Sequence, residues 1–202
     1  MKNPLIPFVA TLALMAGPVF AQETTSDTST ETASEEAQPS EKFLVAEDLN
    51  EPQIGQGYLN ATHEKWEVRC IKAEEGVKEE CRLFNLLSDK EGNAIAQIDM
   101  QSLPKGNKAV AGIEIATPLG SMLTAQIQLK IDAGKSKRYP YLWCDSQGCY
   151  GRFGMTAGEI ASMKKGAKAV VTIVSVGAPD EPILMELSLK GFTAAWNQIS
   201  AE

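Results

Sequence analysis

Few residues of this 202-residue chain are of types that could bind a metal, form a disulfide or catalyse a reaction. Four cysteines and one histidine stand out among them. The cysteines form two sets, Cys70 with Cys81 and Cys144 with Cys149. Neither set has the CxxC spacing of a zinc-ligand pair or of a thioredoxin-type redox motif. Because His63 is the only histidine, a histidine-rich metal site is excluded. We therefore expect no metal site and no cofactor.

An even number of cysteines in an exported chain is typical of disulfide bonds. Four cysteines allow three pairings, and energy alone does not exclude a crossed one, which would close longer loops. We favour Cys70–Cys81 and Cys144–Cys149, because each pair flanks a polar, glycine-containing loop between two expected strands. Facing residues of such a hairpin lie within bridging distance. By loop entropy the two bonds would stabilise the fold by about 3 and about 2 kcal/mol.

None of the groups that could catalyse a reaction occurs in a catalytic pattern. The histidine lies in a polar stretch with no nucleophile motif beside it, so we expect it to be solvated. The loop between Cys70 and Cys81 is polar throughout and lacks the apolar neighbours that would raise a carboxyl pKa. That loop holds four glutamates, Glu74, Glu75, Glu79 and Glu80. Glycines 148, 151 and 154 lack the Lys-Ser/Thr of a phosphate-binding loop, so we expect neither a nucleotide site nor an enzyme.

The stretch 135–153 holds the best candidate for a binding site. Its basic cluster consists of Lys135, Lys137 and Arg138. In a hairpin closed by a 144–149 disulfide, strand alternation gives one face Tyr139, Tyr141, Trp143, Tyr150 and Arg152. The other face then carries Leu142, Cys144, Cys149, Gly151 and Phe153. Such aromatic and arginine residues dominate binding hot spots, although core packing is their commoner role in strands. We expect this face to contact an anionic partner, such as an envelope glycan or a lipid headgroup.

The N-terminus has the features of a secretion signal. Lys2 supplies a positive charge, and the apolar run from Leu5 to Met15 is too short to cross a membrane. Small residues at the positions that a signal peptidase reads predict cleavage after Ala21. We therefore expect residues 1–21 to be removed, which leaves no transmembrane segment in a periplasmic or secreted chain.

Residues 22–61 are expected to form a disordered acidic tail and a transitional segment. Residues 22–42 hold six acids, one base and no large apolar side chain, so they cannot bury enough surface to become ordered. We interpret the tail as a solvating spacer; an acidic interaction arm is the alternative. Pro52, Gly55 and Gly57 predict irregular backbone in the segment that follows. The net charge of −7 argues against a nucleic-acid partner.

Beyond residue 62 the chain has the alternation of short strands separated by turns. Residues 66–70 and 125–132 alternate apolar and polar side chains without a fault. The further expected strands are 81–87, 94–101, 110–116, 139–144, 149–155, 169–176 and 183–190. This pattern predicts a mostly β fold, an antiparallel β-sandwich or barrel stapled by disulfides.

Two short helices are expected among the strands. Thr156 and Glu159 have the spacing of a capping box at a helix start. Gly166 follows two lysines and could take the left-handed conformation that ends a helix. Near the C-terminus an apolar helical stripe is expected to cover one end of the sheet core. It consists of Phe192, Ala195, Trp196 and Ile199.

The ordered motifs from residue 66 onward resemble the invasion-associated locus B family of secreted Gram-negative proteins. They are Trp66-x3-Cys70, Cys81, Pro118-x-Gly120, Cys144-x3-Gly148-Cys149 and Ser188-Leu189-Lys190-Gly191-Phe192. The resemblance covers about residues 62–199, the expected β domain. It implies an all-β periplasmic or envelope domain and, in pathogenic members, a link to virulence through host-cell invasion. It implies no catalytic residues.

Together these observations predict an exported, non-enzymatic binding protein of the envelope or cell surface. Its partner would be an envelope or host-surface component, and the resemblance connects it with host-cell interaction or invasion. The alternative is a periplasmic structural or chaperone-like protein without a host role. Surface exposure or release would favour the first interpretation, and strict periplasmic retention the second.

Overall fold

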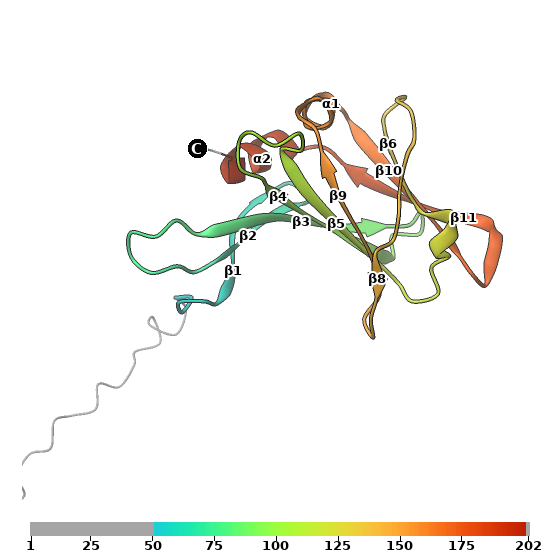
Figure 1. Ribbon diagram of the computed structural model, residues 1–202, viewed down its shortest axis with the longest axis horizontal. Helices are drawn as coiled ribbons and strands as arrows, with labels where there is room; N and C mark the ends of the chain where they lie inside the picture. Colours follow the sequence, from blue (N-terminus) through green and yellow to red (C-terminus); the bar gives the residue numbers. More distant parts are fainter. Residues whose placement is uncertain (1–50, 201–202) are drawn as a thin grey trace, which may run out of the picture. The chain divides into compact units, whose positions relative to one another are not determined.

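The structure, a computed structural model, describes residues 51–200 (Figure 1). The predicted signal peptide and the acidic residues 22–42 lie outside the described residues. Within residues 51–200, eleven strands form one sheet, accompanied by two α-helices and one short 3-10 helix, η1. No helix in this range is long and apolar enough to span a membrane.

The order of strands and helices along the chain follows the sequence pattern. The first strands are β1 (Gly57–His63), β2 (Trp66–Ile71), β3 (Glu80–Ser88), β4 (Ala94–Ser102) and β5 (Ala111–Thr117). The middle elements are η1 (Leu123–Ala125), β6 (Ile127–Ile131), β7 (Lys137–Tyr139), β8 (Trp143–Cys144) and β9 (Cys149–Met155). The last are α1 (Ala157–Lys165), β10 (Lys168–Ser175), β11 (Ala178–Ser188) and α2 (Phe192–Ser200).

The sheet is antiparallel throughout and curls upon itself. Its strand order is β7-β6-β10-β11-β3-β4-β5-β9-β8, and β2 joins β1 to β3. Although β7 lies at one end of this order, it contacts β9 near the other end. The predicted mostly β, antiparallel class with two helices is therefore confirmed, and a single curled sheet replaces the two packed sheets of a sandwich (Figure 1).

The core lies between the inner face of the sheet and α2. Alternation in β4 and β5 buries Ile98 and Ile113, and α2 packs against the first four strands. The predicted helical stripe is buried in full, as Phe192, Ala195, Trp196 and Ile199. The indole of Trp66 is fully buried, and its N–H donates to the Ser188 carbonyl at 3.0 Å. The C-terminal helix therefore covers the core as the sequence predicts.

Both disulfides join residues that face each other on adjacent strands. Cys70 pairs with Cys81 across β2 and β3, and Cys144 pairs with Cys149 across β8 and β9. All four cysteines are therefore bonded. The favoured pairing is confirmed, because each bond closes one hairpin.

The sheet begins earlier than the sequence pattern predicts. The prediction of irregular backbone around Gly57 is wrong, because β1 starts at this residue and pairs with β2 from Gly57–Ile71 to His63–Trp66. A register shift between Leu59 and Ala61 breaks the alternation that would have revealed the strand. The ordered domain therefore extends upstream of residue 62.

The predicted strand 139–144 is two strands with different partners. β7 pairs with β6, whereas β8 pairs with β9. Pro140 lies between them and has no N–H to donate to a ladder, so it marks the point where the chain changes partner. The strand predicted from residue 125 also starts later, at Ile127, because Gln126 has a φ of +60° after η1.

Helix α1 starts as predicted and ends differently. Thr156 and Glu159 form the full capping box. The expected left-handed cap at Gly166 is wrong, since this residue has a φ of −74° and a ψ of 158°. A Cβ there would lie 2.8 Å from Leu189 Cδ1 and 2.9 Å from Asp132 Oδ2. Close packing, and not a special φ, therefore requires glycine at this position.

Candidate functional site

The structure separates the aromatic face that the sequence predicts into three places. Trp143, Tyr150 and Arg152 remain together on the outer face of the sheet. Tyr141 joins a hydrogen-bond network beside the second disulfide, and Tyr139 lines a cleft against α1. The prediction of one shared face is wrong, because the change of strand partner at Pro140 reorients the chain.

The outer aromatic strip consists of Trp143 and Arg152, which are exposed, and Tyr150, which is half-buried. The rings of Trp143 and Tyr150 stack with centroids 4.9 Å apart, and the Arg152 guanidinium lies 5.0 Å from the indole centroid. Arg152 Nε donates to Glu114 at 2.9 Å, and a second nitrogen of the same guanidinium also contacts this carboxylate. The Trp143 side chain, 38% exposed, is therefore held in one orientation at the surface.

A charged hollow continues the strip across the sheet. Glu114 on β5 directly faces Asp99 on β4, and a cavity of about 160 Å³ opens beside them. Burial and the nearby Glu114 charge raise the pKa of Asp99 above its usual value, although Arg69 and Arg82 oppose this shift. The sequence interpretation missed this pair. The polar positions of the expected strands 94–101 and 110–116 could have revealed it once the register was known.

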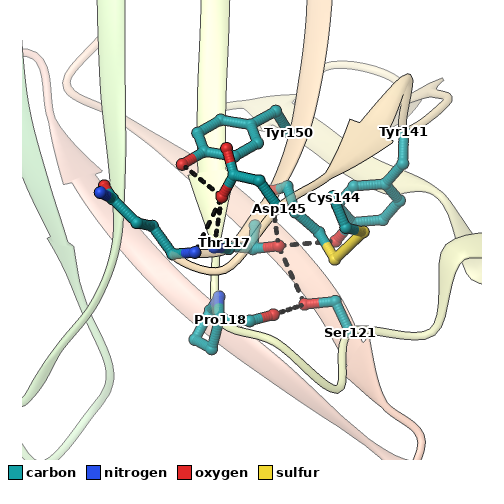
Figure 2. The surroundings of a disulfide bond; sticks show 10 residues. Thr117, Pro118, Ser121, Tyr141, Cys144, Asp145 and Tyr150 are labelled. Atoms are coloured by element: carbon teal, nitrogen blue, oxygen red, sulfur yellow. Dashed lines mark hydrogen bonds between the residues drawn. A yellow bond between two sulfur atoms is a disulfide. The ribbon is translucent and has the colours of Figure 1, made fainter.

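Hydrogen bonds between hydroxyl groups beside the second disulfide link its hairpin to the rest of the sheet (Figure 2). Thr117 Oγ1 donates to the Cys149 carbonyl at 3.2 Å and lies 2.9 Å from Ser121 Oγ and 3.3 Å from Tyr141 Oη. Ser121 in turn donates to the Pro118 carbonyl at 2.8 Å. Each hydroxyl therefore has a structural partner, and Tyr141 supports the hairpin.

Glycines within β9 and directly before it allow other chain segments to approach closely. A Cβ at Gly148 would lie 2.5 Å from the Thr117 carbonyl oxygen, and one at Gly151 would lie 2.5 Å from Ile127 Cδ1. The glycine series that could suggest a phosphate-binding loop is thus a packing feature of a strand. It lets the curled sheet bring β6 against β9.

A larger cleft, which we call the α1 cleft, lies between the β6–β7 hairpin and α1. Its volume is about 430 Å³, and β9 contributes Met155 to its wall. The basic residues Lys135, Lys137 and Lys165 line it, together with Leu129 and other apolar side chains. Two residues of the predicted basic cluster therefore belong to this cleft. The third, Arg138, is exposed on β7 opposite Gln128 and does not line it.

Tyr139 and Glu159 join the hairpin to α1 at one side of the cleft. The Tyr139 ring stacks on Phe153 with centroids 3.5 Å apart, so the prediction that these rings lie on opposite faces is wrong. Lys137 Nζ lies 2.5 Å from Glu159 Oε1, and Tyr139 Oη lies 3.5 Å from the same oxygen. Burial and the Glu159 charge raise the pKa of Tyr139 to about 12, which keeps the phenol protonated as a donor.

The remaining candidate groups make structural contacts. His63 lies in β1, not in a polar loop, and its Nε2 lies 2.8 Å from Gln198 Oε1 of α2. In the loop between the first two cysteines, Glu79 accepts hydrogen bonds from Tyr58 and Lys72, which lower its pKa. Among residues 51–200, no three His, Cys, Asp or Glu side chains are grouped so that they could hold a metal ion.

Comparisons with known proteins agree with the motifs and with the fold. The family model described as "Invasion associated locus B (IalB) protein" matches residues 66–200. Invasion protein B homologues of two Brucella abortus strains are 27% identical over 148 residues, covering 73% of this chain and 82% of theirs. The crystal structure of invasion associated protein b from Bartonella henselae superposes with a TM-score of 0.58 at 20% identity, covering 71% of this chain and 97% of that one.

Proposed function

Because the chain belongs to the invasion associated locus B family, we propose that it is an exported envelope protein that acts by binding and not by catalysis. Two hairpin disulfides support folding in an oxidising compartment such as the periplasm. The hydroxyl of Ser121 and the carboxylate of Glu159 are engaged in structural hydrogen bonds, which supports a non-enzymatic role.

Export has a direct test at the N-terminus. Removal of residues 1–21 should leave a mature chain that begins at Gln22 and carries no free thiol. Intact-mass measurement of protein from the native periplasmic or secreted fraction, before and after reduction and alkylation, reports both features. A chain that still begins at Met1, or four alkylated cysteines without prior reduction, would contradict export.

The partner that best fits the outer surface is a glycan of the bacterial envelope or of a host cell. The observation that carries this proposal is the exposed Trp143 ring, held by Tyr150 and Arg152 beside the charged hollow. An aromatic ring packs against the C–H face of a sugar, while carboxylate and guanidinium groups bond its hydroxyls. Because the ring is already fixed, binding costs little side-chain entropy. Glu114 neutralises Arg152, which favours sugar hydroxyls over a purely anionic partner.

Replacing Trp143 with alanine should weaken glycan binding at least about tenfold, a loss of about 1.4 kcal/mol. The melting temperature should change by less than about 2 °C, because the ring is exposed at the end of a two-residue strand. An array of bacterial and mammalian glycans identifies the ligand, and calorimetry with wild type and variant measures the change. Leu119→Ala is a matched control, since this side chain is 57% exposed in another loop. A large drop in melting temperature, or no glycan bound by wild type, would refute the proposal.

A further inference from the structure

The apolar part of the α1 cleft is a continuous floor. Leu129 and Met155 are buried to within a few per cent, and Ile131 and Tyr139 are partly buried. These four side chains come from β6, β7 and β9, so the floor exists only because the sheet curls. The volume of about 430 Å³ lies within the range of about 300–1,000 Å³ typical of small-molecule sites.

The two acidic side chains of the cleft are already engaged. The Asp132 carboxylate accepts the backbone N–H of Ala167 at 3.2 Å and that of Lys168 at 3.0 Å. Both oxygens of Glu159 are also occupied, Oε2 by the N–H and hydroxyl of Thr156 and Oε1 by Lys137. Burial acts against the charged form of Glu159, but these hydrogen bonds outweigh it and lower its pKa. The Asp132 carboxylate keeps its negative charge, because backbone N–H groups carry no net charge, but within residues 51–200 it makes no ion pair with a lysine of the cleft.

The basic side chains of the cleft are only partly neutralised. Lys137 is paired with Glu159. Lys135 and Lys165 are exposed, and neither makes an ion pair or a side-chain hydrogen bond within residues 51–200. With three lysines against two carboxylates, the lining of the cleft has a formal charge of +1 in a chain whose net charge is −7. Such a local excess of positive charge above an apolar floor suits a ligand with an anionic head and an apolar body.

We propose that the α1 cleft binds a single-chain amphiphile with an anionic head, of the fatty-acid type. The apolar chain covers Leu129, Ile131 and Met155, and the carboxylate is attracted by Lys135 and Lys165. This site is separate from the outer aromatic strip and shares no residue with it. It therefore adds a second ligand to the proposed glycan-binding function and does not depend on it.

Decanoate is a suitable probe, because it is soluble and can be used below its micelle concentration. The mature protein with both disulfides intact is titrated with decanoate, with decyltrimethylammonium and with acetate by calorimetry. Amide chemical shifts recorded by NMR during the titration locate the site. We expect saturable binding of decanoate, at least about tenfold weaker binding of the cationic analogue, no measurable binding of acetate, and shifts at Lys135 and Gly158.

Two variants test separately the lysine charges of the α1 cleft and the space inside it. Lys135→Glu combined with Lys165→Glu should weaken decanoate binding at least about tenfold, whereas Lys105→Glu with Lys108→Glu makes the same change in net charge away from the cleft. Gly158→Phe should abolish binding by filling the cleft. A Cβ at Gly158 meets only Thr156 Oγ1, at 4.0 Å, so the backbone there accepts a side chain.

The outcomes distinguish this proposal from the glycan site. Trp143→Ala should leave decanoate binding unchanged, and Gly158→Phe should leave glycan binding unchanged. Equal affinity for the anionic and cationic amphiphiles, shifts centred on the outer aromatic strip, or no saturable binding of decanoate would each overturn the proposal. An equal loss in the two double lysine variants would also overturn it, because the effect would then reflect net charge alone.

Discussion

Replacing Gly191 with alanine should lower the free energy of unfolding by at least about 3 kcal/mol. Gly191 precedes α2 and has a φ of +79°, a left-handed conformation that costs a residue with a Cβ about 1–2 kcal/mol. The added Cβ would also lie 2.3 Å from the His63 carbonyl oxygen and 2.8 Å from its carbon. Both are backbone atoms, so relief requires β1 and α2 to move apart. Urea denaturation followed by circular dichroism measures the loss.

A second glycine separates backbone strain from the steric clash. Gly76 has a φ of +82°, but a Cβ there meets nothing within 4 Å. Gly76→Ala should therefore lower the free energy of unfolding by only about 1–2 kcal/mol. If the two variants lost equal stability, the close contact between Gly191 and His63 would not exist in solution. Such a result would also question the docking of α2.

Replacing Trp66 with alanine should lower the free energy of unfolding by about 4 kcal/mol or more. Truncation of a buried tryptophan costs about 3–5 kcal/mol through lost burial and the cavity left behind. The Ser188 carbonyl would also lose the indole N–H that donates to it at 3.0 Å, and Phe192 would lose a ring 5.1 Å away. This loss is a large part of the 5–15 kcal/mol that is roughly typical of a domain, so urea denaturation should show a much lower midpoint for the variant.

The control for this variant keeps the aromatic volume and removes the hydrogen bond. Trp66→Phe should lose clearly less stability than Trp66→Ala, because a ring still fills most of the space beside Phe192. Trp143→Ala serves as a second control, since Trp143 is exposed and should leave the unfolding transition nearly unchanged. Equal effects of Trp66→Ala and Trp143→Ala would mean that the buried position of Trp66 is wrong.

Much of the fold could be predicted because it depends on local pattern. Residues 149–155 form β9 with the predicted bounds, and the capping box at Thr156 starts α1. Both disulfides followed from the facing positions of two hairpins. In each case the interaction that fixes the structure joins residues a few positions apart or across one turn. The alternation and spacing of residue types therefore predict it.

The candidate sites depend on contacts between segments that are far apart in the sequence, and no local pattern of side chains predicts such contacts. The sequence pattern groups Lys135, Lys137 and Tyr139 with Trp143. Because the chain changes its strand partner at Pro140, the first three residues line the cleft beside α1 instead. Asp99 and Glu114 face each other only because β4 and β5 adopt one register out of several. Aromatic and basic residues of the candidate sites were recognised by type, but neither their grouping nor the acidic pair was.

The strand alternation and the apolar stripe of α2 can be read directly from the residues, and the cysteine spacing favours the hairpin pairing without excluding a crossed one. These features follow from the alternation of side chains along a chain and from short loops that close on themselves. The curl that brings β7 to β9 and forms the α1 cleft is visible only in the assembled fold. A sheet curls because small twists between neighbouring strands add up across it, so the cleft depends on the assembled sheet and on no single segment.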